Sequence, residues 1–159
     1  MRYTIVAVGK LKERFWTEAC AEYLKRLQPY AKTTVVEVLD ADPARAGGDA
    51  AEYAREGEGI LKALAALPER TRVVLLAIGG RERSSEDLAF HLDELALNGT
   101  SDIAFVIGGS CGVTDAVRAR ADEQVSFGPI TLPHNLARVV LLEQLYRACR
   151  ISRGEPYHK

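Results

Sequence analysis

Cysteine is scarce in this chain. Three cysteines, Cys20, Cys111 and Cys149, occur among 159 residues, and no two of them have CxxC spacing. An odd number of widely separated cysteines argues against a disulfide framework and against a cysteine-rich zinc site. We therefore predict a cytosolic protein.

Long apolar runs are also lacking. The first apolar run, residues 5–8, is followed closely by the charged residues Lys10, Lys12 and Glu13. Such a run is too short for a membrane span, and it does not have the pattern of a signal peptide. We expect neither kind of segment.

Neither sign of charge dominates. The chain has 21 Lys and Arg against 22 Asp and Glu, a formal net charge of -1 and a pI near 6.3. This balance does not give the electrostatic footprint of a protein that binds nucleic acid by charge alone. Contact with RNA would need a local cluster, and near the C-terminus basic residues outnumber Glu143 and Glu155: Arg138, Arg147, Arg150, Arg153 and Lys159. A solvated helix face is an equally good interpretation of these residues.

The common nucleotide and metal motifs are missing. Neither GxGxxG nor a GxxxxGK phosphate loop occurs, which disfavours an ordinary NAD or ATP site. His91, His134 and His158 are far apart, without an HExxH motif or clustered carboxylates. We therefore predict no metal centre.

Strand-like and helix-like segments alternate along the chain, which is 47% apolar. Segments rich in Val, Ile and Thr predict strands at residues 5–8, 33–39, 72–80, 102–109 and 125–132. Amphipathic segments predict helices at residues 13–27, 50–67 and 136–152. Two further helices are predicted, one after a cap at Ser84 or Ser85 and one from a cap at Thr114 to residue 121, and residues 40–48 are predicted to be a loop. The alternation predicts an α/β fold: one domain, residues 1–159, with a mainly parallel sheet and helices on both faces.

Two of the predicted strands end in the same Ile-Gly-Gly sequence, at residues 78–80 and 107–109. Gly128-Pro129 lies within the last predicted strand. A glycine pair lets the backbone turn sharply and a ligand approach closely, at the edge where open α/β sheets place their sites. Tight turns without a ligand are the alternative interpretation.

A proline-fixed turn leads into the last predicted helix. Pro133 fixes one backbone dihedral angle, and His134 and Arg138 follow at the helix entrance. The first backbone N–H groups of a helix have no partner within it, so those of the helix beginning near Leu136 are free for a ligand. A general base, a substrate contact and a simple turn residue are all open roles for His134.

The sequence Gly108-Gly109-Ser110-Cys111-Gly112 formally satisfies the GxSxG pattern of a hydrolase nucleophile elbow. The other triad members would be Asp115 or Asp122 and His134 or His158. The chain is short for such a hydrolase, and both acids lie on the helix directly after the elbow, which disfavours this reading. Cys111 is no stronger as a nucleophile, because only a nearby helix N-terminus would lower its pKa.

Four groups of residues together resemble the RlmH family of the SPOUT superfamily. They are Ile107-Gly108-Gly109 followed by Gly112; Leu132-Pro133-His134 with Leu136 and Arg138; residues 143–148; and Pro156-Tyr157-His158. The opening at residues 6–9 fits as well, and the resemblance covers essentially the whole chain. Members of this family use S-adenosylmethionine to methylate N3 of a pseudouridine in 23S ribosomal RNA.

The resemblance implies a SPOUT-type fold in which the C-terminal segment passes through a loop and forms a trefoil knot. It also implies that S-adenosylmethionine lies in the knotted region against three loops, residues 76–80, 108–112 and 127–132. The residues expected to bind it are Leu76, Gly80, Gly108, Gly109, Gly112, Phe127, Gly128, Pro129, Ile130, Thr131 and Leu132.

The resemblance further implies a homodimer whose active site is completed by the partner's C-terminal tail, acting on 23S rRNA in the assembled ribosome. The residues expected to act in catalysis are His134, Arg138, Tyr157 and His158. We expect Arg138 to orient the base or a phosphate while the partner's Tyr157 and the partner's His158 close over the nucleotide. A free terminus usually frays, so these two aromatic residues are either disordered or docked. A different SPOUT specificity, such as a tRNA position, and a non-catalytic binding module are the alternatives.

Overall fold

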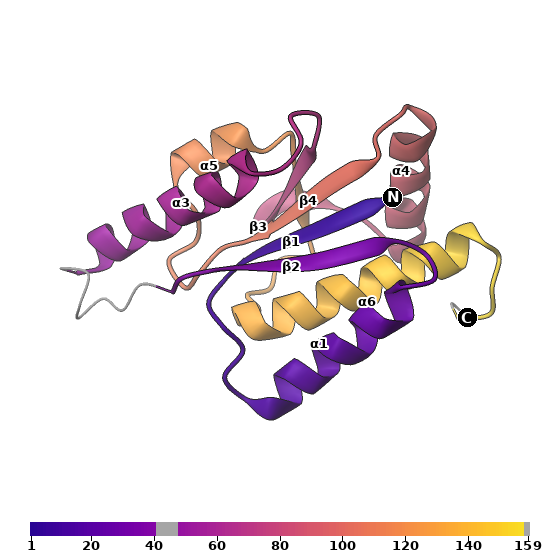
Figure 1. The fold of residues 1–159 in the computed structure, drawn as a ribbon, viewed down its shortest axis with the longest axis horizontal. Helices are drawn as coiled ribbons and strands as arrows, with labels where there is room; N and C mark the ends of the chain where they lie inside the picture. Colours follow the sequence, from indigo (N-terminus) through magenta and orange to yellow (C-terminus); the bar gives the residue numbers. More distant parts are fainter. Residues whose placement is uncertain (41–47, 158–159) are drawn as a thin grey trace.

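The computed structural model describes residues 1–40 and 48–157. They form a five-stranded sheet in the order β2-β1-β4-β3-β5, in which neighbouring strands are parallel (Figure 1). The strands are β1 (Arg2–Val8), β2 (Lys32–Val38), β3 (Arg72–Glu82), β4 (Asp102–Ile107) and β5 (Glu123–Ser126). The helices are α1 (Arg14–Leu27), α3 (Asp49–Ala65), α4 (Ser85–Leu97), α5 (Asp115–Arg120) and α6 (His134–Ser152). No helix among the described residues is long and apolar enough to span a membrane.

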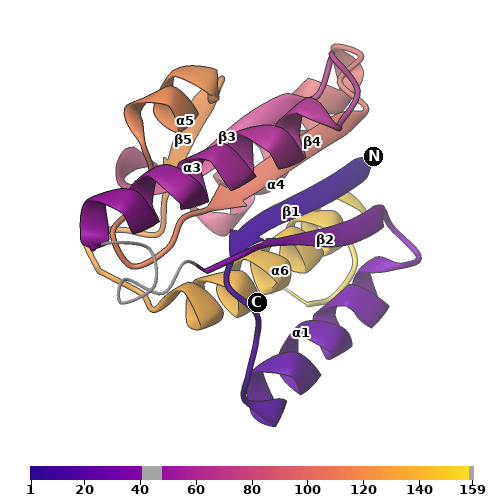
Figure 2. The ribbon, with the colours of Figure 1, turned by 60° about the vertical axis from the view of Figure 1, so that its left-hand side comes forward.

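Helices cover both faces of this sheet (Figure 2). Side chains from α1, α4 and α6 form one hydrophobic core with the sheet, and side chains from α3 and α5 form a second core on the opposite face. Successive residues of β1 alternate between them: Ile5 and Ala7 belong to the first core, and Val6 and Val8 to the second. A strand buried on both faces reads as a continuous apolar run, as residues 5–8 do. The predicted α/β architecture is confirmed.

Local sequence signals explain where two of the helices begin. Ser84 Oγ accepts a hydrogen bond from the N–H of Asp87 at 3.0 Å, and the Asp87 carboxylate accepts one from the N–H of Ser84 at 3.4 Å, which together form a capping box. Thr114 Oγ1 accepts from the N–H of Val117 at 3.4 Å and caps α5. Both predicted caps are confirmed, because a short side-chain acceptor satisfies donors that the first helical turn leaves open.

The predicted ends of two strands are wrong. β3 does not stop at its glycine pair but continues to Glu82, with a shift in pairing that places both Leu76 and Arg81 opposite Val125 of β5. Residues 77–80 therefore bulge out of the ladder. β5 ends at Ser126, because Gly128 has a φ of 101° and the proline after it cannot donate to a ladder, so residues 127–133 form a loop. The predicted loop at residues 40–48 lies largely outside the described residues, and the trefoil knot stays a prediction.

Candidate active site

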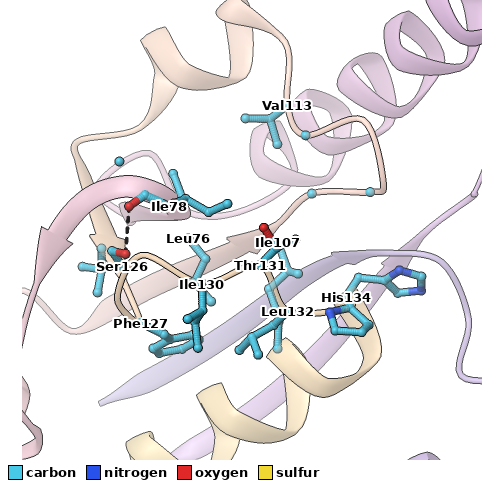
Figure 3. Close-up of a pocket in the computed structure, with 18 of the residues that line it drawn as sticks. Leu76, Ile78, Ile107, Val113, Ser126, Phe127, Ile130, Thr131, Leu132 and His134 are labelled. Carbon is cyan, nitrogen blue, oxygen red and sulfur yellow. Dashed lines mark hydrogen bonds between the residues drawn. The ribbon is translucent and has the colours of Figure 1, made fainter.

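A cavity of about 730 Å³ opens at the carboxyl edge of the sheet, where β3, β4 and β5 release their loops (Figure 3). Its size falls within the range of small-molecule sites, and its lining is mostly apolar side chains and glycine backbone. The predicted residues that line it are Leu76, Gly108, Gly109, Gly112, Phe127, Gly128, Ile130, Thr131, Leu132 and His134. The three loops named from the sequence thus converge on one cavity.

The loop after β4 is tightly folded, and its residues Gly108 and Gly109 have no room for side chains. A Cβ on Gly108 would lie 2.6 Å from Val113 Cγ1 and 2.8 Å from the carbonyl oxygen of Gly112, and one on Gly109 would collide with the carboxylate of Glu56. The Tyr53 hydroxyl of α3 donates to the Val113 carbonyl at 2.6 Å and holds the end of the loop. The backbone is therefore presented to the cavity without side chains in between.

Ser126 joins the bulge of β3 to the loop after β5. This residue is 4% exposed. Its hydroxyl accepts from the N–H of Gly128 at 3.1 Å and lies 2.9 Å from the carbonyl oxygen of Ile78 (Figure 3). A buried hydroxyl that satisfies backbone groups of both loops fixes their spacing. The width of the cavity between Ile78 and Phe127 depends on this contact.

Two residues predicted to bind the cofactor lie outside the lining of the cavity. Gly80 packs against β5, where an added Cβ would come within 2.8 Å of the backbone of Gln124 and Val125. Pro129 is exposed and does not line the cavity. In this structure Gly80 thus permits close packing of strands, and its predicted contact with a cofactor stays a prediction, as does that of Pro129.

His134 is the first residue of α6 and lines the cavity beside Ala137. Pro133 provides no side-chain cap, and the first hydrogen bond of the helix runs from the N–H of Ala137 to the carbonyl of Pro133 at 2.9 Å. The N–H groups of residues 134–136 therefore have no partner within the helix and lie at the cavity edge. The His134 ring stands against Gly9, where a Cβ would lie 3.2 Å from its Nε2.

Arg138 lies one turn further along α6 and is only 2% exposed. Its Nη1 donates to Glu37 at 2.8 Å, and its Nη2 donates to the carbonyl oxygen of Gly9 at 2.8 Å. The guanidinium is therefore engaged inside the protein and does not line the cavity. This placement differs from the expected direct contact with substrate, since a buried charge must be paired within the protein. The geometry supports a positioning role for Arg138, through Gly9 and His134.

Tyr157 packs against the far end of α6, away from the cavity of its own chain. Its ring meets Tyr146 at a centroid distance of 4.8 Å, lies under the Arg147 guanidinium at 4.6 Å, and its hydroxyl donates to Glu143 at 3.2 Å. Burial raises the pKa of Tyr157 to about 12, and a hydrogen bond with Tyr23 and the charge of Glu143 act in the same direction. The tail is docked as far as Tyr157, and His158 lies outside the described residues.

The arginines near the C-terminus do not form an open basic patch. Arg147 pairs with Glu143 at 2.6 Å, and Arg150 pairs with Glu155 at 3.0 Å. Arg153 lies over the ring of Tyr30 at 4.5 Å. The cluster expected from the sequence is therefore largely matched by acidic and aromatic neighbours, and Lys159 lies outside the described residues.

Sequence reasoning missed several residues that line the cavity: Val113, Arg118, Val125, Ser126 and Ala137. Only the bulge in β3, set by a pairing shift over long range, brings residues 77–79 to the cavity. The structure also brings the carboxylates of Asp40, Glu52 and Glu56 within 4.8 Å of one another. Acidic groups gather in this way without a metal, and we assign none to them.

Among the described residues, no hydrogen bond joins Ser110 or either candidate acid, Asp115 or Asp122, to His134. The side-chain contact of Ser110 Oγ within this part of the chain is with Cys111 Sγ at 3.9 Å. Asp122 accepts from the N–H of Val73 at 2.7 Å, near the start of β3, at the opposite edge of the sheet. An acid that far from the serine cannot orient a base for it.

The fold and the cavity define an α/β protein whose ligand site lies at the carboxyl edge of a parallel sheet, the usual position in such folds. A family model described as "Predicted SPOUT methyltransferase" matches residues 1–158. The chain is 52% identical over 160 residues to a Listeria welshimeri protein named "Ribosomal RNA large subunit methyltransferase H", with full coverage of both chains. A Bacillus cereus protein of the same name is 49% identical, again over the full length of both.

The solved structure of "a probable methylase family protein from Haemophilus influenzae Rd KW20" is similar in fold. It has a TM-score of 0.54 at 15% identity and covers 99% of this chain and 70% of that one. The family model and the full-length relatives are the stronger findings. The chain belongs to the SPOUT methyltransferase family.

Proposed function

We propose that this protein transfers a methyl group from S-adenosylmethionine to N3 of a pseudouridine in the 23S RNA of the large ribosomal subunit. The observation that supports this most directly is a cavity built from the loops after β3, β4 and β5, in a chain half identical over its full length to proteins named ribosomal RNA large subunit methyltransferase H.

The residues around the cavity suit S-adenosylmethionine. A planar adenine needs apolar walls and backbone groups for its edge, and Leu76, Phe127 and Leu132 with the backbone of the two glycine loops supply them. Glycines with positive φ, Gly112 at 82° and Gly128 at 101°, allow the backbone to come close to a ligand. Cofactor binding by Leu76, Gly80, Gly108, Gly109, Gly112, Phe127, Gly128, Pro129, Ile130, Thr131 and Leu132 remains our proposal.

S-adenosylmethionine supplies an activated methyl group when bound, so the chain has only to position the nucleotide, exclude water and accept one proton. The imide N3 of pseudouridine loses that proton as it is methylated, and a base close to it speeds the reaction. His134 at the cavity edge and His158 in the tail are the candidates among the predicted residues. Tyr157 stays protonated at neutral pH because its pKa is about 12, so it serves as a hydrogen-bond donor.

The position of the tail supports a homodimer with a shared active site. α6 has 19 residues and is therefore about 28 Å long, with His134 at one end and the tail beyond the other (Figure 1). Tyr157 is held against Tyr146, which lies about 18 Å along the helix from His134. The tail therefore cannot serve its own cavity while it is docked, and the cavity of a second copy is the site it would complete.

The near-neutral charge of the chain suits a large, shaped substrate. With a net charge of -1, nonspecific attraction to RNA is weak, and recognition would depend on the surface of the assembled ribosome more than on bulk charge. We therefore propose the ribosome in the cytoplasm, with its pseudouridine already formed, as the substrate.

Methyl transfer to ribosomes from a strain that lacks this protein tests the proposal. Purified protein, S-adenosylmethionine with a labelled methyl group and those ribosomes should yield about one methyl group per 23S RNA, and mass spectrometry of the digested RNA should identify N3-methylpseudouridine. Label in transfer RNA alone would support a different SPOUT specificity. Stabilisation by S-adenosylmethionine without transfer to any RNA would support a binding module.

A further inference from the structure

A basic segment with exposed aromatic surface leaves β1 beside the cavity and is not used by the proposed chemistry. It consists of residues 10–16, Lys-Leu-Lys-Glu-Arg-Phe-Trp, which connect β1 to the first turn of α1. Phe15 is 59% exposed, and its ring lies 4.9 Å from the ring of the partly buried Trp16. The segment therefore combines an exposed aromatic ring with two lysines close to the cavity.

The structure fixes the beginning of this segment at the cavity edge. Arg138 donates to the carbonyl oxygen of Gly9 at 2.8 Å, and Gly9, with a φ of 83°, turns the chain directly against His134. Leu11 then packs onto the hydrophobic core. Phe15 is six positions after Gly9, at most about 20 Å of extended chain. Because α1 and α6 both follow parallel strands, both begin at the same edge of the sheet (Figure 1).

The lysines in this segment are free, unlike the arginines near the C-terminus. Within residues 1–40 and 48–157, neither Lys10 nor Lys12 forms an ion pair. Arg14 pairs with Glu18 at 2.6 Å in a highly exposed pair, and Glu13 is the acidic residue of the segment itself. The segment keeps a formal charge of +2 on a chain whose total is -1.

We propose that residues 10–16 bind the single-stranded RNA that flanks the target nucleotide, with Lys10 and Lys12 on its phosphates and a base stacked on Phe15. Aromatic rings beside cationic residues are the general means of binding single strands without reading their sequence. A second copy of the chain is the poorer occupant, because lysine is depleted at protein interfaces. This inference rests on the proposed function and assigns it an RNA surface outside the cavity.

Substitutions in this segment should weaken substrate binding and leave the cavity intact. We expect Phe15→Ala to raise the KM for ribosomes about 5- to 150-fold, which corresponds to the loss of one stacked base. Lys10→Gln with Lys12→Gln should raise KM and lower the slope of log affinity against log salt by about 1.4, or 0.7 for each phosphate contact to a single strand. In both variants kcat and the affinity for S-adenosylmethionine, measured by calorimetry, should stay near the wild-type values.

Matched controls and the wild-type protein separate the possible failures. Phe90→Ala on α4, another exposed aromatic at 65%, and Lys62→Gln on α3 should leave KM and the salt slope unchanged. If the wild-type protein methylates ribosomes but the segment variants keep its KM and salt slope, this proposal is overturned and the proposed function stands. If Phe15→Ala instead splits the protein into monomers in sedimentation, the surface binds a second copy and the RNA assignment is wrong. If the wild-type protein methylates no RNA, the proposed function itself fails.

Discussion

Mixed dimers offer a direct test of whether the tail acts on the cavity of the partner. One subunit would lack residues 157–159, and the other would carry Gly112→Val in the loop after β4. Gly112 has a φ of 82° and no heavy atom within 4 Å of an added Cβ, so the main effect of the valine is a strained backbone at about 1–2 kcal/mol, which the loop relieves by moving. Each variant alone should be inactive for a different reason.

The expected activity follows from the geometry. In a mixed dimer, the truncated subunit keeps an intact cavity and receives the intact tail of its partner, so one of the two sites is complete and activity should be about half that of the wild type. If the tail served its own cavity, neither site would be complete and activity would be lost. We expect the first outcome, because the docked Tyr157 packs on Tyr146, about 18 Å along α6 from His134.

The assay is methyl transfer by mixed dimers isolated through two different affinity tags. Gly99→Val is the matched control for the strained loop, because Gly99 also has a positive φ, 86°, and open space around it, in the turn that follows α4. A dimer of one truncated and one Gly99→Val subunit should also have about half of the wild-type activity, since its truncated subunit has the one completed cavity. If a dimer of one truncated and one Gly112→Val subunit is no more active than the homodimers of either variant, the shared site is refuted.

Three further predictions concern stability. Gly80→Ala should lower the free energy of unfolding in urea by about 1–3 kcal/mol, because its Cβ would come within 2.8 Å of the β5 backbone. Gly79→Ala, whose Cβ would have nothing within 4 Å, should lower it by less than about 1 kcal/mol, and equal losses in the two variants would contradict the packing argument. Arg138→Met should lower the free energy of unfolding by about 2–3 kcal/mol and reduce activity, because Glu37 and the Gly9 carbonyl lose their partner. An unfolding midpoint equal to that of the wild type would exclude a positioning role for Arg138. Folding raises the pKa of Tyr157 from 10 to about 12, so its contribution to stability is present below pH 10 and is lost as the pH rises to 12. Tyr157→Phe should therefore reduce the loss of stability above pH 10, and an unchanged dependence of the unfolding free energy on pH would count against the burial of Tyr157.

The α/β architecture could be predicted from the sequence because each of its signals is local. The apolar run at residues 5–8 needs only a two-sided core, and Ser84 and Thr114 cap helices through residues three positions away. The ends of β3 and β5 could not be predicted in this way. Whether a strand continues past Gly80 depends on whether another strand lies close enough to pair with it, and that strand lies more than forty residues later in the chain.

The candidate site was also predictable only where its signals are local. Glycine pairs at the predicted strand ends indicated two of the cavity loops, since the conformational freedom of glycine is a property of the residue itself. The burial of Arg138 could not be read from its sequence neighbours, because its partners Gly9 and Glu37 are 129 and 101 residues away. A charged residue at a helix entrance looks the same in sequence whether it faces solvent or the interior.

The bond between Arg138 and Gly9 joins the first turn of the chain to its last helix. During synthesis from the N-terminus, the turn at Gly9 leaves the ribosome 129 residues before the side chain that fixes it. The edge that carries the proposed active site is therefore among the last parts of the molecule to become ordered. A nascent or C-terminally shortened chain that ends before residue 138 would lack both this bond and the core residues Leu141, Leu142 and Leu145 of α6, so the proposed active site cannot form until translation is nearly complete.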